Sequence, residues 1–201
     1  MNMSDKTTFI NQFVNSVYGV LLGFGFCNAM QKISQDFIIF HFAVVMFAIL
    51  VLCIHWWDWM SNIKKYVKSS AFEFSIDILI LLTIEWMFFE YQNFLIFIWL
   101  LAGLGFMNFL WVLHFRITQR YNLQTFFSSK SKFSKEAFNH ILKRFLGFII
   151  YILLSIGYSY FAIYNMTLLS NEILNWIFLI ILMIAFLFDR MILYRNRKFD
   201  I

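Results

Sequence analysis

The chain has 201 residues, of which 62% are hydrophobic, 22% aromatic and only 13% charged, and its formal net charge is +5. Soluble domains are about 45–50% apolar and about 25% charged, so this composition excludes an ordinary soluble domain as well as a disordered chain. The mean hydropathy of +0.73, with 28 Phe and no Pro, is typical of an integral membrane protein.

Six stretches are long and apolar enough to cross a bilayer as helices, which takes about 20 residues each. In chain order they cover residues 9–28, 37–60, 72–91, 94–115, 145–165 and 173–194. Short connectors that are nearly free of basic residues alternate with longer basic ones, of which 116–144 is the longest. We therefore expect an all-α polytopic protein that forms a single transmembrane domain over residues 1–201.

The distribution of basic residues predicts the orientation of these spans. Of the 16 Lys and Arg, all except Lys32 fall on one side when six spans alternate across the membrane. Basic loops stay on the cytoplasmic side, so both termini and the basic loop 116–144 are expected there. An N-terminal signal peptide that is cleaved near Ala29 is the alternative for the first stretch, although Asn11 and Asn15 interrupt its apolar core.

The basic loop is the only sizeable segment outside the expected spans. Apolar residues at helical spacing from Ala137 to Phe145 predict an amphipathic helix that starts at Ser134 and continues into the fifth span. We expect its basic side chains to bind anionic lipids of the inner leaflet, at about 1 kcal/mol per residue, with a cytosolic protein partner as the alternative. The residues assigned to this contact are Lys130, Lys132, Lys135, Lys143 and Arg144.

Polar side chains inside apolar helices are costly and are therefore the first candidates for a functional role. A hydrogen-bonded network toward the cytoplasmic side is predicted from Asn11, Asn15, His55, Trp56, Asp58 and Asp77. A solvated position at the membrane interface is the alternative for Asp58, and it is also expected for Glu73, His114, Asp189 and Arg190. Farther out, Glu85 lies at a depth similar to that of His41 and, if buried alone, favours its neutral form. These two residues are a candidate ion or proton site.

No enzyme motif accompanies these residues. His41 and His55 are about 21 Å apart along one helix, too far to share a metal ion, and two cysteines cannot build a structural zinc site. There is no His-Glu-x-x-His or Gly-x-Ser-x-Gly pattern. We expect no catalytic residues, no metal or other cofactor and no nucleic-acid partner.

Two short segments resemble the endolysosomal potassium channel family and its bacterial relatives. The first helix of that family carries Arg-x-x-x-Phe-Ser-Asp, and here Phe13, Val14 and Asn15 take the last three positions, with Phe9 in place of the Arg. The segment Ile54-His55-Trp56-Trp57-Asp58 is similar to that family's aromatic–Trp–x–Asn segment. The resemblance implies six-helix subunits with cytoplasmic termini that assemble as tetramers in the bacterial inner membrane.

The resemblance also implies that the first helix lines a cation-conducting pore, with a hydrophobic constriction at Val20 that gates by dewetting. Phe13, Val17, Val20 and Phe24 form the expected pore-lining stripe, for which ordinary helix packing beside the small residues Ser16, Gly19 and Gly23 is the alternative. Two other functions remain open. One is a small-solute uptake subunit with a ligand near His41, Glu85 and Trp86; the other is a non-conducting sensor or anchor of a stress or phage-defence system that acts through the basic loop.

Overall fold

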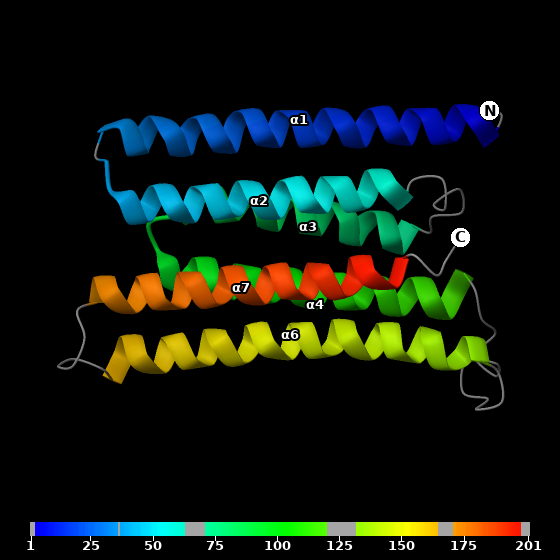
Figure 1. Cartoon of the computed structure of the whole chain (residues 1–201). Helices are drawn as coiled ribbons and strands as arrows, with labels where there is room; N and C mark the ends of the chain where they lie inside the picture. The colour runs from blue at the N-terminus through cyan, green and yellow to red at the C-terminus, as the bar shows by residue number, and fades with distance from the viewer. Residues whose placement is uncertain (1–2, 36, 63–70, 120–131, 165–170, 198–201) are drawn as a thin grey trace.

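The three-dimensional structure is a computed structural model that describes residues 3–35, 37–62, 71–119, 132–164 and 171–197. These residues form six helices and no strand, which confirms the all-α prediction for this part of the chain (Figure 1). The helices are α1 (Met3–Gln35), α2 (Ile39–Asn62), α3 (Ala71–Phe89), α4 (Phe94–Gln119), α6 (Lys132–Tyr164) and α7 (Asn171–Arg197).

Each predicted span coincides with one helix, but two helices are much longer than their apolar cores. The first, α1, continues through the proposed cleavage point at Ala29 to Gln35, and Ala29 is fully buried against the bundle. The fifth, α6, begins at Lys132 rather than at Ser134 and runs without a break into its apolar half. The amphipathic start of α6 therefore belongs to the same helix as the predicted span.

Within the described residues, four helices contain a segment that is long and apolar enough to cross a membrane. These segments are Ile39–Asp58 in α2, Phe94–His114 in α4, Ile141–Tyr164 in α6 and Glu172–Met191 in α7. In contrast, α3 has only 19 residues and carries Glu73, Asp77 and Glu85, while the first third of α1 is rich in polar residues. The length and apolar character of these four helices thus support a membrane-embedded helical bundle.

The helices lie side by side along one long axis, and α1 forms an edge of the bundle (Figure 1). Its main packing partners are α2 and α3, whereas α4 packs between α3 and α6, and α7 packs on α6 and α2. The start of α1 and the end of α7 lie at the same end of the bundle. This arrangement leaves one side of α1 outside the packed core.

The core consists mainly of aromatic rings and aliphatic side chains from the faces where helices meet. Phe47 of α2 contacts both Phe97 of α4 and Phe186 of α7, with ring centroids 6.1 and 5.6 Å apart. Phe94 packs edge-on against Tyr158 of α6 at 5.2 Å. Edge-on aromatic pairs of this kind add about 0.5–1.5 kcal/mol beyond the burial of their surface.

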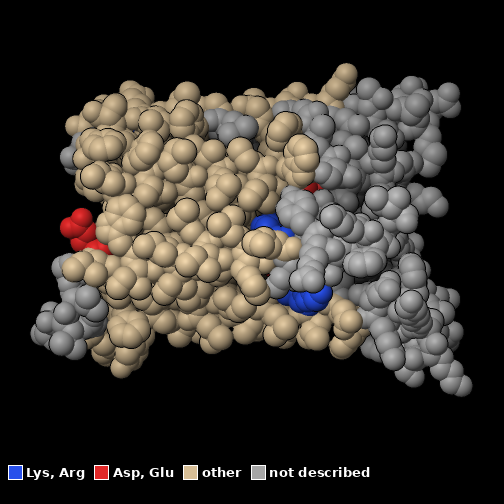
Figure 2. Space-filling view, viewed as in Figure 1, with Lys and Arg blue, Asp and Glu red and all other residues tan. Residues whose placement is uncertain are grey.

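The outer surface is also strongly apolar, as expected for helices that face lipid. On the face shown in Figure 2, uncharged side chains cover most of the described surface, and the few acidic and basic groups are separated from one another. Val20, Leu153 and Met191 are each more than 60% exposed. In a soluble protein such a surface would aggregate, whereas in a bilayer it is the favoured contact with the acyl chains.

Candidate functional site: a buried charged cluster

Charged side chains from three helices meet inside the bundle. The strongest interaction joins Arg190 of α7 to Asp58 of α2, where Nη1 of Arg190 donates a hydrogen bond of 2.6 Å to Oδ2 of Asp58. Both side chains are almost fully buried. Arg190, which is expected from the sequence at a solvated interface, is therefore internal, and Asp58 is internal with it. The correction for Arg190 follows from the mutual neutralisation of the pair, which lowers the cost of burying each charge.

A second ion pair adjoins the first. Nη1 of Arg144 on α6 lies 3.5 Å from Oδ2 of Asp189, and Nε of Arg190 lies 3.9 Å from the same oxygen. Gly147 makes room for this carboxylate, since a Cβ atom at that position would lie 2.9 Å from Oδ1 of Asp189. Two arginines and two aspartates thus form a cluster with no net charge, contributed by α2, α6 and α7.

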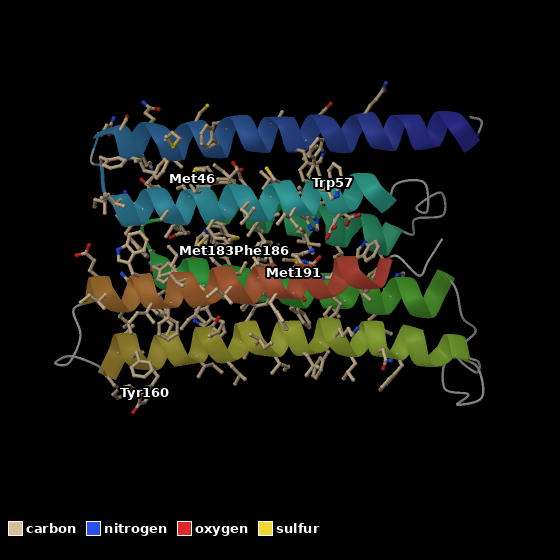
Figure 3. All side chains as sticks on the ribbon, in the orientation of Figure 1. Met46, Trp57, Tyr160, Met183, Phe186 and Met191 are labelled. Atoms are coloured by element: carbon tan, nitrogen blue, oxygen red, sulfur yellow. The ribbon has the colours of Figure 1, made fainter. Side chains whose placement is uncertain are left out.

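The guanidinium of Arg190 also lies against an aromatic ring. Its central carbon is 5.1 Å from the ring centroid of Phe186, one turn earlier on α7. Phe186 points into the bundle, whereas the next residue after Arg190, Met191, lies on the surface (Figure 3). The cation–π contact fixes the arginine against the core and contributes about 0.5–2 kcal/mol.

His55 lies one turn before Asp58 on α2 and is buried beside the cluster. Its imidazole interacts electrostatically with Arg190, Asp58 and Arg144. On the other side of α2, the buried Tyr18 of α1 interacts electrostatically with Asp58 and with Asp77 of α3. The predicted network around His55, Asp58 and Asp77 therefore lies at one place in the bundle, and Tyr18 joins it from α1.

A small cavity of about 20 Å³ adjoins the cluster, which is enough for about one water molecule. Residues of five helices line it, among them His55, Asn108, Arg144, Tyr151 and Arg190. Three donors of the residues that line it have no hydrogen-bond partner in the described part of the chain: Nε of Arg144, Nε of Arg190 and the hydroxyl of Tyr151. Donors that converge on a polar cavity of this size suit an enclosed water or another small acceptor.

Of the remaining network residues, the structure describes only the side chain of Trp56. Trp56 is 39% exposed and points away from the core, because it follows the buried His55 on α2. The side chains of Asn11 and Asn15 lie outside the described part of the structure, as does that of Phe13. On the expected pore-lining stripe, Val17 is half-buried, while Val20 and Phe24 are exposed.

Arg144 was grouped with the basic residues expected to bind lipid, and the structure corrects its position. Its side chain is 11% exposed and faces Asp189, because the helical turn after Lys143 directs it toward α7. Lys143 is half-buried, and the side chains of Lys130, Lys132 and Lys135 are outside the described residues. The Arg144–Asp189 pair is not predicted in the sequence analysis. It could have been found there, because these two opposite charges lie at the same expected depth in the membrane.

The two outer candidates do not form a described pair. His41 packs edge-on against the ring of Tyr91, with centroids 5.5 Å apart. Glu85 is buried, and its Oε2 has no hydrogen-bond partner in the described structure. Within the described residues, no group of three or more His, Cys, Asp or Glu side chains is arranged to hold a metal ion.

The cluster pairs acidic with basic side chains, an arrangement suited to charge pairing, proton transfer and water binding. Comparisons with known proteins add no assignment: no protein-family model, curated protein or solved structure matches the chain.

Proposed function

We propose that the protein is an oligomeric ion channel that conducts cations with a potassium-like preference, and that α1 lines its pore. Each subunit crosses the bacterial inner membrane six times, with both termini in the cytoplasm. Four subunits surround one axis, and anionic lipids of the inner leaflet contact the basic segment that precedes the apolar half of α6. The pore is formed by the assembly and not within one subunit.

We infer that α1 and α3 also cross the membrane, in addition to the four most apolar helices. The length and position of α1 and α3 support this. A helix of 33 residues such as α1 is about 50 Å long, and the 19 residues of α3 span about 28 Å, close to the thickness of a hydrocarbon core. Both lie alongside α2 in the bundle (Figure 1). The acidic residues of α3 do not forbid a crossing, because Glu85 is buried and Asp77 is half-buried.

One observation carries the pore assignment: α1 is an edge helix with an open outward face. Val20 is 67% exposed and Phe24 is 64% exposed, whereas Tyr18, Ala29 and Ile33 on the opposite face are buried. Gly19 and Gly23 form a Gly-x-x-x-Gly pattern beside Val20, and a Cβ atom at either position would meet nothing within 4 Å. Small residues at this spacing let helices of separate subunits approach closely.

The charged cluster supports the same proposal because it holds the helices behind α1 together. It ties α2 to α7 and α7 to α6, while Tyr18 joins α1 to Asp58 and Asp77. A helix that lines a pore must hold its position while its other face is wet or exposed to ions. Buried polar contacts to α2 and α3 supply that anchoring, and Val20 then presents an apolar ring that gates by dewetting.

Ion flux from proteoliposomes tests the pore assignment. Val20→Trp is expected to reduce potassium flux at least tenfold, because four indoles at the axis would close an apolar constriction. Ile184→Trp is the matched control, since Ile184 lies on α7 and is 61% exposed. Unchanged flux in Val20→Trp, with normal folding, would refute the pore assignment.

Disulfide cross-linking tests the assembly independently of conduction. The chain has two cysteines, and Cys27 lies on α1 seven residues after Val20, exposed like it. In a Cys53→Ser background, a membrane-permeant oxidant is expected to produce covalent dimers through Cys27. The reverse variant, with Cys53 retained on α2 and Cys27 replaced by Ser, is expected to produce few. Equal yields from both variants would contradict an axis formed by α1.

A solute uptake subunit is the second candidate, because the structure has a larger hollow at the other end of the bundle. This hollow has a volume of about 510 Å³, within the range of small-molecule sites, and polar groups of Glu90, Gln92, Asn93 and Asn175 line it. Native mass spectrometry of the gently solubilised protein separates the two functions. A monomer that retains a small organic molecule would favour uptake, whereas a tetramer without one favours the channel.

A further inference from the structure

Glu85 is the one acidic side chain described deep in α3 that has no charged partner. The residue is 9% exposed, and its neighbours Ile84, Met87 and Phe88 belong to the hydrophobic core. Its Oε2 atom is inaccessible and accepts no hydrogen bond from the described protein. An ionised carboxylate in such surroundings would cost several kcal/mol, so the packed state favours the neutral acid.

The carboxyl group lies directly against the backbone of α1. A Cβ atom on Gly25 would be 2.6 Å from Oε2 of Glu85 and 3.1 Å from Oε1. An alanine at this point of the α1–α3 interface would therefore force the carboxyl group of Glu85 to move. By contrast, Gly19 and Gly23 on the same helix face open space, so Gly25 is distinguished by its contact with Glu85.

Among the described residues, the carboxyl group of Glu85 has no ion-pair partner. On α3 and the turn that follows it, Asp77 lies two turns away, and Glu90 accepts a hydrogen bond of 3.3 Å from Trp86. The titratable side chains described on the three helices packed against α3 are Tyr18, Cys27 and Lys32 on α1, His41, Cys53, His55 and Asp58 on α2, and His114 on α4.

We propose that Glu85 is an exchangeable proton-binding site, protonated when α1 is packed on α3 and able to release its proton only when α1 moves away at Gly25. We assign a proton rather than a metal cation to the site, because no group of three or more His, Cys, Asp or Glu side chains among the described residues is arranged to hold a metal ion. The inference rests on the α1–α3 packing and goes beyond the proposed conduction, since it requires neither an oligomer nor a pore. In a conducting assembly it would couple the position of α1 to pH.

The membrane-permeant reagent dicyclohexylcarbodiimide tests this directly, because it reacts with protonated carboxyls in apolar surroundings. The carboxyl adds across one C=N bond: its oxygen bonds to the central carbon and its proton moves to a nitrogen. The O-acylisourea that forms rearranges by transfer of the acyl group to nitrogen, which gives a stable N-acylurea without a leaving group or an oxidant. Peptide mass spectrometry of the full-length protein in proteoliposomes then locates the adduct.

We expect one adduct per chain at Glu85 at pH 7, and none in Glu85→Gln. Glu90→Gln is the matched control on the same segment and is expected to leave the labelling unchanged. An exposed carboxyl, ionised above pH about 4.3, loses about tenfold in reactivity for each pH unit. Labelling of Glu85 is instead expected to change less than threefold between pH 5.5 and 7. Absence of the adduct, or a tenfold decrease per pH unit, would overturn the proposal.

The role of Gly25 has its own pair of variants. Gly25→Ala pushes the carboxyl out of the interface toward a hydrated position, so its labelling at pH 7 is expected to fall at least fivefold. Gly23→Ala, two residues earlier with open space around it, is expected to label like the parent protein. Equal labelling of both variants would overturn the proposal that the packing of α1 at Gly25 determines the protonation of Glu85. Protection of Glu85 from the reagent by sodium at constant pH would overturn the assignment of the site to a proton.

Discussion

Asp58, near the end of α2, accepts a hydrogen bond of 2.6 Å from Arg190, which lies 132 positions later near the end of α7. The pair joins two helices that are distant in the chain, at a depth where neither charge is well hydrated. Arg144 of α6 and Asp189 of α7 form a second ion pair beside it. The three helices α2, α6 and α7 are therefore held in register by electrostatics as well as by apolar packing.

Asp58→Asn is expected to destabilise the protein by about 3–5 kcal/mol, because Arg190 then remains buried without its main counter-charge. The measurement is the unfolding free energy in mixed micelles under denaturant. Replacing both members, as Asp58→Leu with Arg190→Met, is expected to cost less than the single change, since no lone charge is left. Glu172→Gln, on the exposed start of α7, serves as the control and should stay within about 0.5 kcal/mol of the parent. If the double variant had a lower unfolding free energy than Asp58→Asn, the assignment of a buried ion pair would be contradicted.

Two buried tyrosines on α6 provide a second comparison. The hydroxyl of Tyr158 donates a hydrogen bond of 2.6 Å to Asn175 of α7, whereas the hydroxyl of Tyr151 has no hydrogen-bond partner among the described residues. Tyr158→Phe is expected to cost about 1–2 kcal/mol because it leaves Asn175 without its donor. Tyr151→Phe is expected to be neutral or slightly stabilising, measured by the same unfolding assay. A larger cost for Tyr151→Phe would show that its hydroxyl has a partner in the adjoining cavity.

The close approach of α4 and α6 depends on Gly105. A Cβ atom there would lie 2.9 Å from a ring carbon of Tyr151 and 3.6 Å from the backbone of Phe148. Gly105→Ala is therefore expected to destabilise the protein by about 1–3 kcal/mol through overpacking. Gly103→Ala, two residues earlier with open space, is expected to stabilise α4 by up to about 1 kcal/mol because alanine is the better helix former. Thermal unfolding of both variants should thus change in opposite directions.

The helices themselves were predictable from the sequence, because runs of about 20 apolar residues have few alternatives to a helix in lipid. Boundaries were less accurate where a helix extends beyond its apolar core. The polar ends of α1 and α6 carry no hydropathy signal, and their extent depends on what they pack against.

The candidate site was predicted in part. Counting depth along the helices drew attention to His55, Asp58 and Glu85, all of which the structure buries or pairs. Arg190 was assigned to the interface and Arg144 to lipid, because a sequence shows the depth of a residue but not the direction in which its side chain points. That direction depends on helix rotation, which only the packing of α6 and α7 against α2 determines.

Lys143 and Arg144 are adjacent on α6, and their variants can distinguish a basic side chain at the bundle surface from one inside the bundle. Arg144 is buried against Asp189, with an N–O distance of 3.5 Å, whereas Lys143 is half-buried at the bundle surface. Arg144→Gln is expected to lower the unfolding free energy by about 1–3 kcal/mol, because Asp189 loses its nearer charged donor. Lys143→Gln is expected to leave stability nearly unchanged and to weaken retention of anionic lipid, counted by native mass spectrometry. If both variants instead lost lipid equally at unchanged stability, Arg144 would belong to the lipid-facing surface after all.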